Sequence, residues 1–142
     1  MEVKVKYFDD ALTKLSPIQN GDWIDLRACE TVELHKGDYV KIPLGIAMQL
    51  PEGYEALVLP RSSTFERYGV ICVNSMGVID NSYCGDNDEW KFPVLATRRA
   101  TIPKGERICQ FRIVANQPQL ILSEVEHLHN ADRGGFGSTG RR

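Results

Sequence analysis

The chain has few of the residues that build disulfide frameworks and metal centres. Its four cysteines include no CxxC pair, and there are only three histidines. This spacing argues against a zinc site and favours a reduced, cytoplasmic protein. We expect Cys72 and Cys109 to be small core residues, and all three histidines to be exposed surface residues. The full sets are Cys29, Cys72, Cys84 and Cys109, and His35, His127 and His129.

Long apolar runs and an excess of positive charge are also missing. No window approaches the length of a transmembrane span, and the opening stretch MEVKVKYFDD alternates apolar with charged residues instead of forming a signal-peptide core. The net charge of -2 indicates neither a nucleic-acid partner nor an anionic membrane. A polyanionic ligand would therefore need local positive groups or a metal ion.

What the sequence does contain is a series of short apolar runs, each closed by glycine, proline, asparagine or aspartate. Such a pattern in 142 residues predicts one all-β domain, a sandwich or a barrel. The expected strands lie within residues 3–8, 31–35, 38–43, 45–50, 54–60, 69–74, 77–80, 90–96, 107–114 and 119–125.

Only the stretch RSSTFERYG, residues 61–69, indicates a helix, and a very short one. Ser63 and Glu66 have the spacing of a capping box, and Gly69 can end the helix. The free N–H groups would then lie beside Arg61 and Ser62, a combination suited to phosphate. The alternative is a cap that binds nothing beyond its own helix.

The stretch NSMGVIDNSYCGD, residues 74–86, predicts a hairpin with an aspartate where its apolar strand ends. Asn74 carries the donor and acceptor needed to read a pyrimidine edge, and Tyr83 offers a flat face to a sugar. An ionised Asp80 could accept a proton from an attacking water. The alternative for each is ordinary turn chemistry, with side chains bound to their own backbone.

Two strand residues are further candidates. Asp25, between Ile24 and Leu26, could support a metal-bound water near a phosphate or simply face solvent. Gln110 interrupts an apolar strand and could reach a ligand or a partner subunit, or be an edge glutamine. A two-residue period places Ile108, Gln110 and Arg112 on one face, and Arg107, Cys109, Phe111 and Ile113 on the other.

The C-terminal stretch DRGGFGSTGRR holds four glycines and a single large apolar side chain, Phe136. Alone it cannot bury enough surface to offset the entropy of ordering. It is either a disordered tail or a flexible flap that orders over a ligand. Phe136 between glycines, with Arg133 before it, favours the flap.

In this order the stretches DLRA, PRSS, NSMGVIDNSYCGD, GERICQF and RGGFGSTG resemble the five motifs of the trimeric dUTPases, the deoxyuridine triphosphate nucleotidohydrolases. The resemblance spans about residues 25–140 and looks most like the short enzymes of Gram-positive bacteria and their phages. It implies a distorted jelly-roll β-barrel over residues 1–130. Residues 131–142 would be a flexible glycine-rich arm closing over a neighbouring subunit's site.

The resemblance also implies an activity, the hydrolysis of dUTP to dUMP and pyrophosphate with Mg²⁺. It implies a homotrimer with active sites at subunit interfaces. Asp80 would activate the water that attacks the α-phosphorus, Gln110 would contact phosphate or that water, and Asp25 would hold a water of the metal. The implied substrate-binding residues are Arg61, Ser62, Ser63, Asn74, Gly77, Val78, Ile79, Tyr83, Arg133, Phe136, Gly137, Ser138 and Thr139.

The chain departs from the family pattern in two places. Arg133 precedes Phe136 by three positions where five are usual, so Arg133 could approach differently or Arg141 or Arg142 could assist. Residues 86–93 resemble an insertion, in which Trp90 could cover the base or fill the core or an interface; the core or interface is favoured. A nucleotide-gated regulatory protein that binds a phage or host partner is the alternative function.

Overall fold

A computed structural model describes residues 1–17 and 20–137. Within these residues the chain forms short strands and one short helix, which confirms the all-β prediction. No helix in the described part is long and apolar enough to cross a membrane. The strands are β1 (Lys4–Tyr7), β2 (Ile24–Arg27), β3 (Val32–Leu34), β4 (Tyr39–Pro43), β5 (Ile46–Gln49), β6 (Tyr54–Pro60), β7 (Val70–Cys72), β8 (Gly77–Ile79), β9 (Lys91–Ala96), β10 (Ala100–Ile102) and β11 (Arg107–Ala115), and the helix is α1 (Thr64–Tyr68).

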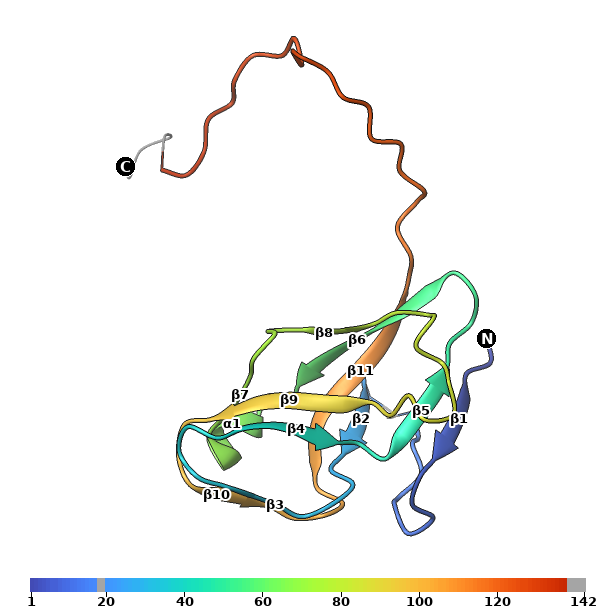
Figure 1. Ribbon diagram of the computed structural model, residues 1–142, viewed down its shortest axis with the longest axis vertical. Helices are drawn as coiled ribbons and strands as arrows, with labels where there is room; N and C mark the ends of the chain where they lie inside the picture. The colour runs from blue at the N-terminus through green and yellow to red at the C-terminus, as the bar shows by residue number, and fades with distance from the viewer. Residues whose placement is uncertain (18–19, 138–142) are drawn as a thin grey trace.

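The strands pair antiparallel in four small sheets. The largest has the order β2-β11-β6-β8, the next β4-β9-β7, and two pairs, β1-β5 and β10-β3, close the ends (Figure 1). Apolar residues of both larger sheets meet in one core, in which Trp90 packs edge-on against Phe111 with ring centroids 5.4 Å apart. Trp90 is 1% exposed, so the core position expected for it is confirmed.

The cysteine and histidine predictions are also confirmed. Cys72 and Cys109 are buried, and all four cysteines are free thiols. His35, His127 and His129 are exposed. Burial raises the pKa of the Cys109 thiol well above its usual value, as expected for an inert core cysteine.

Helix α1 forms where the sequence predicts it, but the capping box does not. Ser63 takes helical backbone angles, and its side chain makes no capping hydrogen bond. Thr64 holds this end of the helix instead: its hydroxyl accepts from the Arg61 N–H (3.1 Å) and donates to the Ile108 carbonyl (2.7 Å). The predicted helix end is confirmed, because Gly69 adopts the left-handed conformation with φ 64°.

The strict alternation predicted for β11 is wrong at its start. The pairing of β11 with β2 shifts between Arg107 and Cys109, as in a β-bulge. Ile108 and Cys109 are consecutive, yet both are buried. Beyond the bulge the register is regular, and Gln110 lies opposite Asp25.

From residue 116 to 137 the chain forms neither helix nor strand, and it leaves the body as a long extended arm (Figure 1). The strand predicted at 119–125 is therefore wrong for the isolated chain, because this run has no pairing strand among the described residues. Its apolar side chains Leu120, Ile121 and Leu122 are exposed. Phe136 is fully exposed, and the predicted site residues Ser138 and Thr139 lie outside the described residues.

Candidate active site

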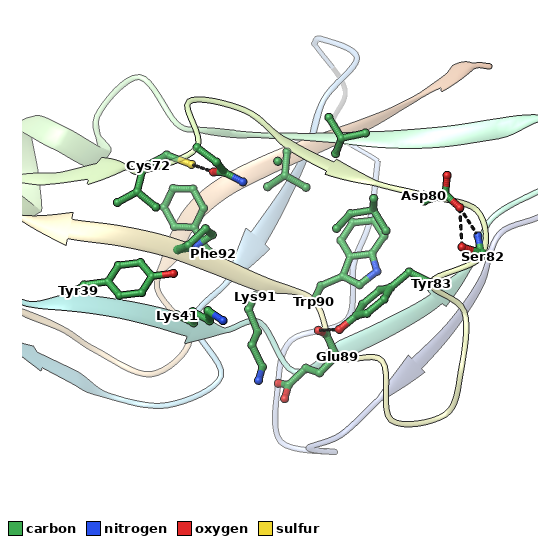
Figure 2. A pocket seen from close by; sticks show the side chains of 17 residues that line it. Tyr39, Lys41, Cys72, Asp80, Ser82, Tyr83, Glu89, Trp90, Lys91 and Phe92 are labelled. Carbon is green, nitrogen blue, oxygen red and sulfur yellow. Dashed lines mark hydrogen bonds between the residues drawn. The ribbon is translucent and has the colours of Figure 1, made fainter. Parts of the chain in front are cut away.

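A cavity of about 710 Å³ lies between the 74–83 hairpin and strands β4 and β9. In Figure 2, Asp80 and Ser82 lie at one end of this pocket and Tyr39 at the other, with Trp90 and Phe92 between them. Every hairpin residue predicted for the site lines it: Asn74, Gly77, Val78, Ile79, Asp80 and Tyr83.

Strand β8 forms one wall of the pocket because it packs closely on β6. Gly77 lies opposite Val58 in the ladder, and a Cβ added at Gly77 would lie 3.2 Å from the Cβ of Val58. A larger residue here would therefore require Val58 to shift by a few tenths of an ångström. The hairpin backbone at the pocket is held in place by this approach and by the Ala56–Ile79 pairing.

Asn74 is held at the pocket by a contact that the sequence did not indicate. The thiol of Cys72 donates to Asn74 Oδ1 at 2.9 Å. A thiol is a weak donor, so Oδ1 keeps acceptor capacity and the amide Nδ2 keeps its donors. Burial raises the pKa of Cys72, which keeps it protonated as that donor. The Asn74 amide can therefore both donate to a ligand and accept from it.

Asp80 follows the last residue of β8, and its carboxylate lies at the pocket rim. Ser82 donates to Asp80 Oδ1 twice, from its hydroxyl (2.6 Å) and from its backbone N–H (2.8 Å). These bonds, the hydroxyl's first, lower the pKa of Asp80. Asp80 is therefore an ionised carboxylate at neutral pH, as a proton acceptor must be.

Tyr83 is fixed at both ends. Its backbone N–H donates to the Asp80 carbonyl (3.0 Å), and its phenol donates to the Glu89 carbonyl (2.9 Å). Partial burial, and then the charges of Asp88 and Glu89, raise the pKa of the phenol, so it stays neutral. The ring is therefore a fixed, uncharged part of the pocket lining (Figure 2).

A second group of predicted residues gathers where β2, β6 and β11 meet. Asp25 Oδ1 lies 3.2 Å from Arg61 Nε, and its Oδ2 lies 3.2 Å from Arg107 Nη1. Gln110 donates from Nε2 to the Pro60 carbonyl (3.1 Å), immediately before Arg61. Ser62 and Ser63 follow in the same turn. This group offers two guanidinium groups and several hydroxyl and amide donors, a set suited to phosphate oxygens.

The two groups do not share a pocket within one chain. None of Asp25, Arg61 and Gln110 lines the large cavity, so the predicted catalytic pair Asp80 and Gln110 is not brought together. The predicted arm residues form a third set, because the exposed segment with Arg133, Phe136 and Gly137 leads away from the body (Figure 1).

Several lining residues were missed by sequence reasoning. Lys41, Cys72, Ser82, Glu89 and Lys91 all line the cavity. The two lysines come from β4 and β9, far from the hairpin in sequence, and no local pattern connects them. Ser82 had a detectable signal, since a serine two residues after an aspartate is typical of an Asx-type turn.

Comparisons with known proteins identify the family. The family model for dUTPase matches residues 20–140. The chain belongs to the dUTPase family. It is 56% identical over 142 residues to the SPbeta prophage-derived deoxyuridine 5'-triphosphate nucleotidohydrolase YosS of Bacillus subtilis (strain 168), covering 100% of both chains. It is 38% identical over 147 residues to the deoxyuridine 5'-triphosphate nucleotidohydrolase of Finegoldia magna, covering 99% of each.

Solved structures of dUTPases share the fold. The Staphylococcus bacteriophage 80alpha dUTPase with dUPNHPP aligns with a TM-score of 0.79 at 21% identity, covering 99% of each chain. A mutant dUTPase from phage phi11 of S. aureus, described with a structural Mg(II) ion, aligns with a TM-score of 0.77 at 18% identity, covering 92% of this chain and 100% of that one. The predicted dUTPase fold and enzyme class, a dUTP diphosphatase, are therefore confirmed.

Proposed function

We propose that this dUTPase hydrolyses dUTP to dUMP and pyrophosphate, with Asp80 activating the water that attacks the α-phosphorus. The observation that carries this assignment is the Asp80 carboxylate, ionised and fixed at the rim of a pocket large enough for a nucleoside. A water adding in line to phosphorus must lose its proton, and a positioned carboxylate can take it. The product, dUMP, is the precursor for thymidylate synthesis, and the reaction keeps the concentration of dUTP low.

The hairpin is the proposed uracil site. A uracil edge carries one N–H donor between two carbonyl acceptors, and the Asn74 amide with the backbone of residues 77–79 can match that pattern. Cytosine has a different donor pattern and would leave buried polar groups unpaired. The close β8–β6 packing at Gly77 leaves this wall little freedom to move aside, which supports exclusion of the thymine 5-methyl group.

The group around Asp25 is the proposed triphosphate site. Arg61, Ser62, Ser63 and Gln110 would bind phosphate oxygens. The dUTPase family uses Mg²⁺. No group of three or more His, Cys, Asp or Glu within residues 1–17 and 20–137 could hold a metal alone, which fits an ion bound mainly by phosphates and its own waters. Asp25 would hold one such water, and the bound ion would offset phosphate charge.

The separation of these groups supports a shared active site. Neither the hairpin pocket nor the group around Asp25 contains all the predicted site residues, so each is incomplete in one chain. The unpaired apolar run at 119–125 supports an arm that pairs with another copy, since unpaired strand groups favour such pairing. We infer a homotrimer with active sites at its subunit interfaces. In each site an arm would supply Arg133, Phe136, Gly137, Ser138 and Thr139.

A nucleotide panel tests this function together with the role of Tyr83. Pyrophosphate release is measured from dUTP, dCTP, dTTP and UTP, with magnesium and again with EDTA. We expect magnesium-dependent release from dUTP alone.

Tyr83→Ala should reduce the preference for dUTP over UTP by about tenfold or more, because the ring that excludes a 2′-hydroxyl is gone.

Tyr83→Phe is the matched control, because it keeps the ring and removes only the bond to the Glu89 carbonyl. It should keep most of the sugar discrimination. Unchanged discrimination between dUTP and UTP in Tyr83→Ala would mean that the ring only packs against the pocket. Hydrolysis of several nucleotides by the wild type would contradict the proposed uracil site.

A further inference from the structure

The Ser82 hydroxyl makes a hydrogen bond to Asp80 that the hairpin turn itself does not require. Two donors of Ser82, the hydroxyl and the backbone N–H, bind the same carboxylate oxygen, Oδ1, at 2.6 and 2.8 Å (Figure 2). The backbone bond alone completes an Asx turn. The hydroxyl is therefore a second donor beyond those the turn needs, and no other side chain in the described part of the chain donates to Asp80.

The frame around this contact is rigid. The Tyr83 N–H closes the turn onto the Asp80 carbonyl, and the Asn81 side chain donates from Nδ2 to the carbonyls of Pro51 (2.8 Å) and Leu50 (3.2 Å). The turn is thereby tied to the loop before β6. The Ser82 hydroxyl on this turn therefore holds the Asp80 carboxylate in one orientation, with Oδ1 accepting its hydrogen bond.

We propose that Ser82 is a positioning residue for the hydrolytic reaction: its hydroxyl fixes Asp80 through Oδ1 and leaves Oδ2 as the oxygen that accepts the water proton. This inference rests on the proposed role of Asp80 as the base. A fixed acceptor matters because small displacements of a catalytic group from its productive geometry cost a large part of the rate. Ser82 itself touches neither the water nor the nucleotide in this account.

The hydrogen bonds from Ser82 are the main cause of the lowered pKa of Asp80. The side-chain and backbone bonds from Ser82 lower the pKa of Asp80 in that order, and partial desolvation opposes them. The other charged or titratable side chains that line the pocket are Tyr39, Lys41, Cys72, Tyr83, Glu89 and Lys91. Glu55 on β6 lies one residue beyond the Ala56–Ile79 pair.

The direction of the pH effect follows. A base with a lowered pKa stays ionised, and active, down to a lower pH, and activity falls as the pH drops through that pKa. Removing the Ser82 hydroxyl raises the pKa of Asp80 toward its ordinary value. The acidic limb of the rate profile then moves to higher pH.

Ser82→Ala removes the hydroxyl and keeps the backbone bond. We expect kcat for dUTP to fall by about tenfold while KM changes little, because an acceptor that is no longer fixed lowers only the rate of the reaction. The acidic limb of kcat/KM should move to higher pH, and a carbon-13 carboxyl titration of Asp80 in the free enzyme should move the same way.

Two controls accompany it. Ser82→Thr keeps a hydroxyl and should show the wild-type pH profile. Cys84→Ser changes an exposed position in the loop just after the turn, and it should leave kcat and the profile unchanged. An unchanged acidic limb and an unchanged carboxyl titration in Ser82→Ala would overturn the proposal, even if the variant melted at a lower temperature.

Asp80→Asn in the same assays distinguishes the role of Asp80 from that of Ser82. Wild-type kcat in Asp80→Asn would remove Asp80 from the base role, and the role of Ser82 would fall with it. An inactive Asp80→Asn together with an unmoved acidic limb in Ser82→Ala would overturn only the role of Ser82.

Discussion

Replacing Asp80 with asparagine should lower kcat for dUTP by about 10²- to 10⁴-fold, the range that general-base catalysis contributes. The amide has nearly the same shape and can still accept the Ser82 bonds at Oδ1. It cannot take a proton at neutral pH. Affinity for a non-hydrolysable dUTP analogue should therefore stay near the wild-type value. Pyrophosphate release and calorimetric titration measure the two quantities separately.

Asp86→Asn is the matched control for this substitution. Asp86 is an exposed aspartate further along the same loop, and its backbone carbonyl, not its carboxylate, accepts from Lys6 Nζ. The same chemical change there should leave kcat unaltered. Wild-type turnover by Asp80→Asn, with Asp86→Asn equally active, would contradict the proposed base.

The second large effect is expected from the arm. Deleting residues 133–142 should lower kcat for dUTP by about tenfold to 10²-fold, because it removes the Arg133 cation and the Phe136 ring that would close the site. Neither residue has a place on the body of its own chain; Phe136 is fully exposed. The apolar run at 119–125 is retained, so the oligomer should stay intact by sedimentation.

Phe136→Ala separates the ring from the rest of the arm. It should reproduce part of the loss, whereas a deletion with an unaffected rate would mean that the arm does not close the site. The shortened spacing from Arg133 to Phe136 makes Arg133→Ala informative as well. A smaller loss in Arg133→Ala than in the deletion would indicate that another arm cation contributes.

Most strands were predictable because their signals are local. Alternation in Lys4–Tyr7 and a turn residue after each short run mark the strand without reference to the rest of the chain. Strand β10, Ala100–Ile102, was missed because three residues carry too little pattern and its existence depends on pairing with β3. The strand predicted at 119–125 is absent for the opposite reason. This run has the composition of a strand but no partner strand within the described residues.

The helix cap and the β11 bulge could not be predicted from local sequence either. Ser63 and Glu66 satisfy a spacing rule, yet Thr64 makes the bonds at this end because the Ile108 carbonyl lies beside it in the folded chain. That carbonyl is available next to the bulge at residues 107–109. The local sequence indicates neither the bulge nor the neighbouring strand, so tertiary contacts decide which residue caps the helix.

The hairpin side of the site was predictable as a unit, since Asn74, Asp80 and Tyr83 come from one short stretch and their proximity follows from the turn. Arg107 was not assigned to the phosphate group, because its contact with Asp25 depends on the register of β11 against β2. The roles of Gln110 and of the arm stay predictions. Both depend on which chain completes the site.

The hairpin and the phosphate group are proposed to act together across a subunit boundary, and mixed oligomers test this arrangement most directly. Asp80→Asn and Arg61→Ala, each on a differently tagged chain, are co-expressed, and oligomers carrying both tags are isolated. Each variant alone should be nearly inactive. If a site takes its hairpin from one subunit and its phosphate group from another, about one site in three of each mixed trimer should regain activity, because one boundary of the ring joins the two intact groups. No restoration, in oligomers shown to contain both chains, would contradict the shared site and place both groups' action within one chain.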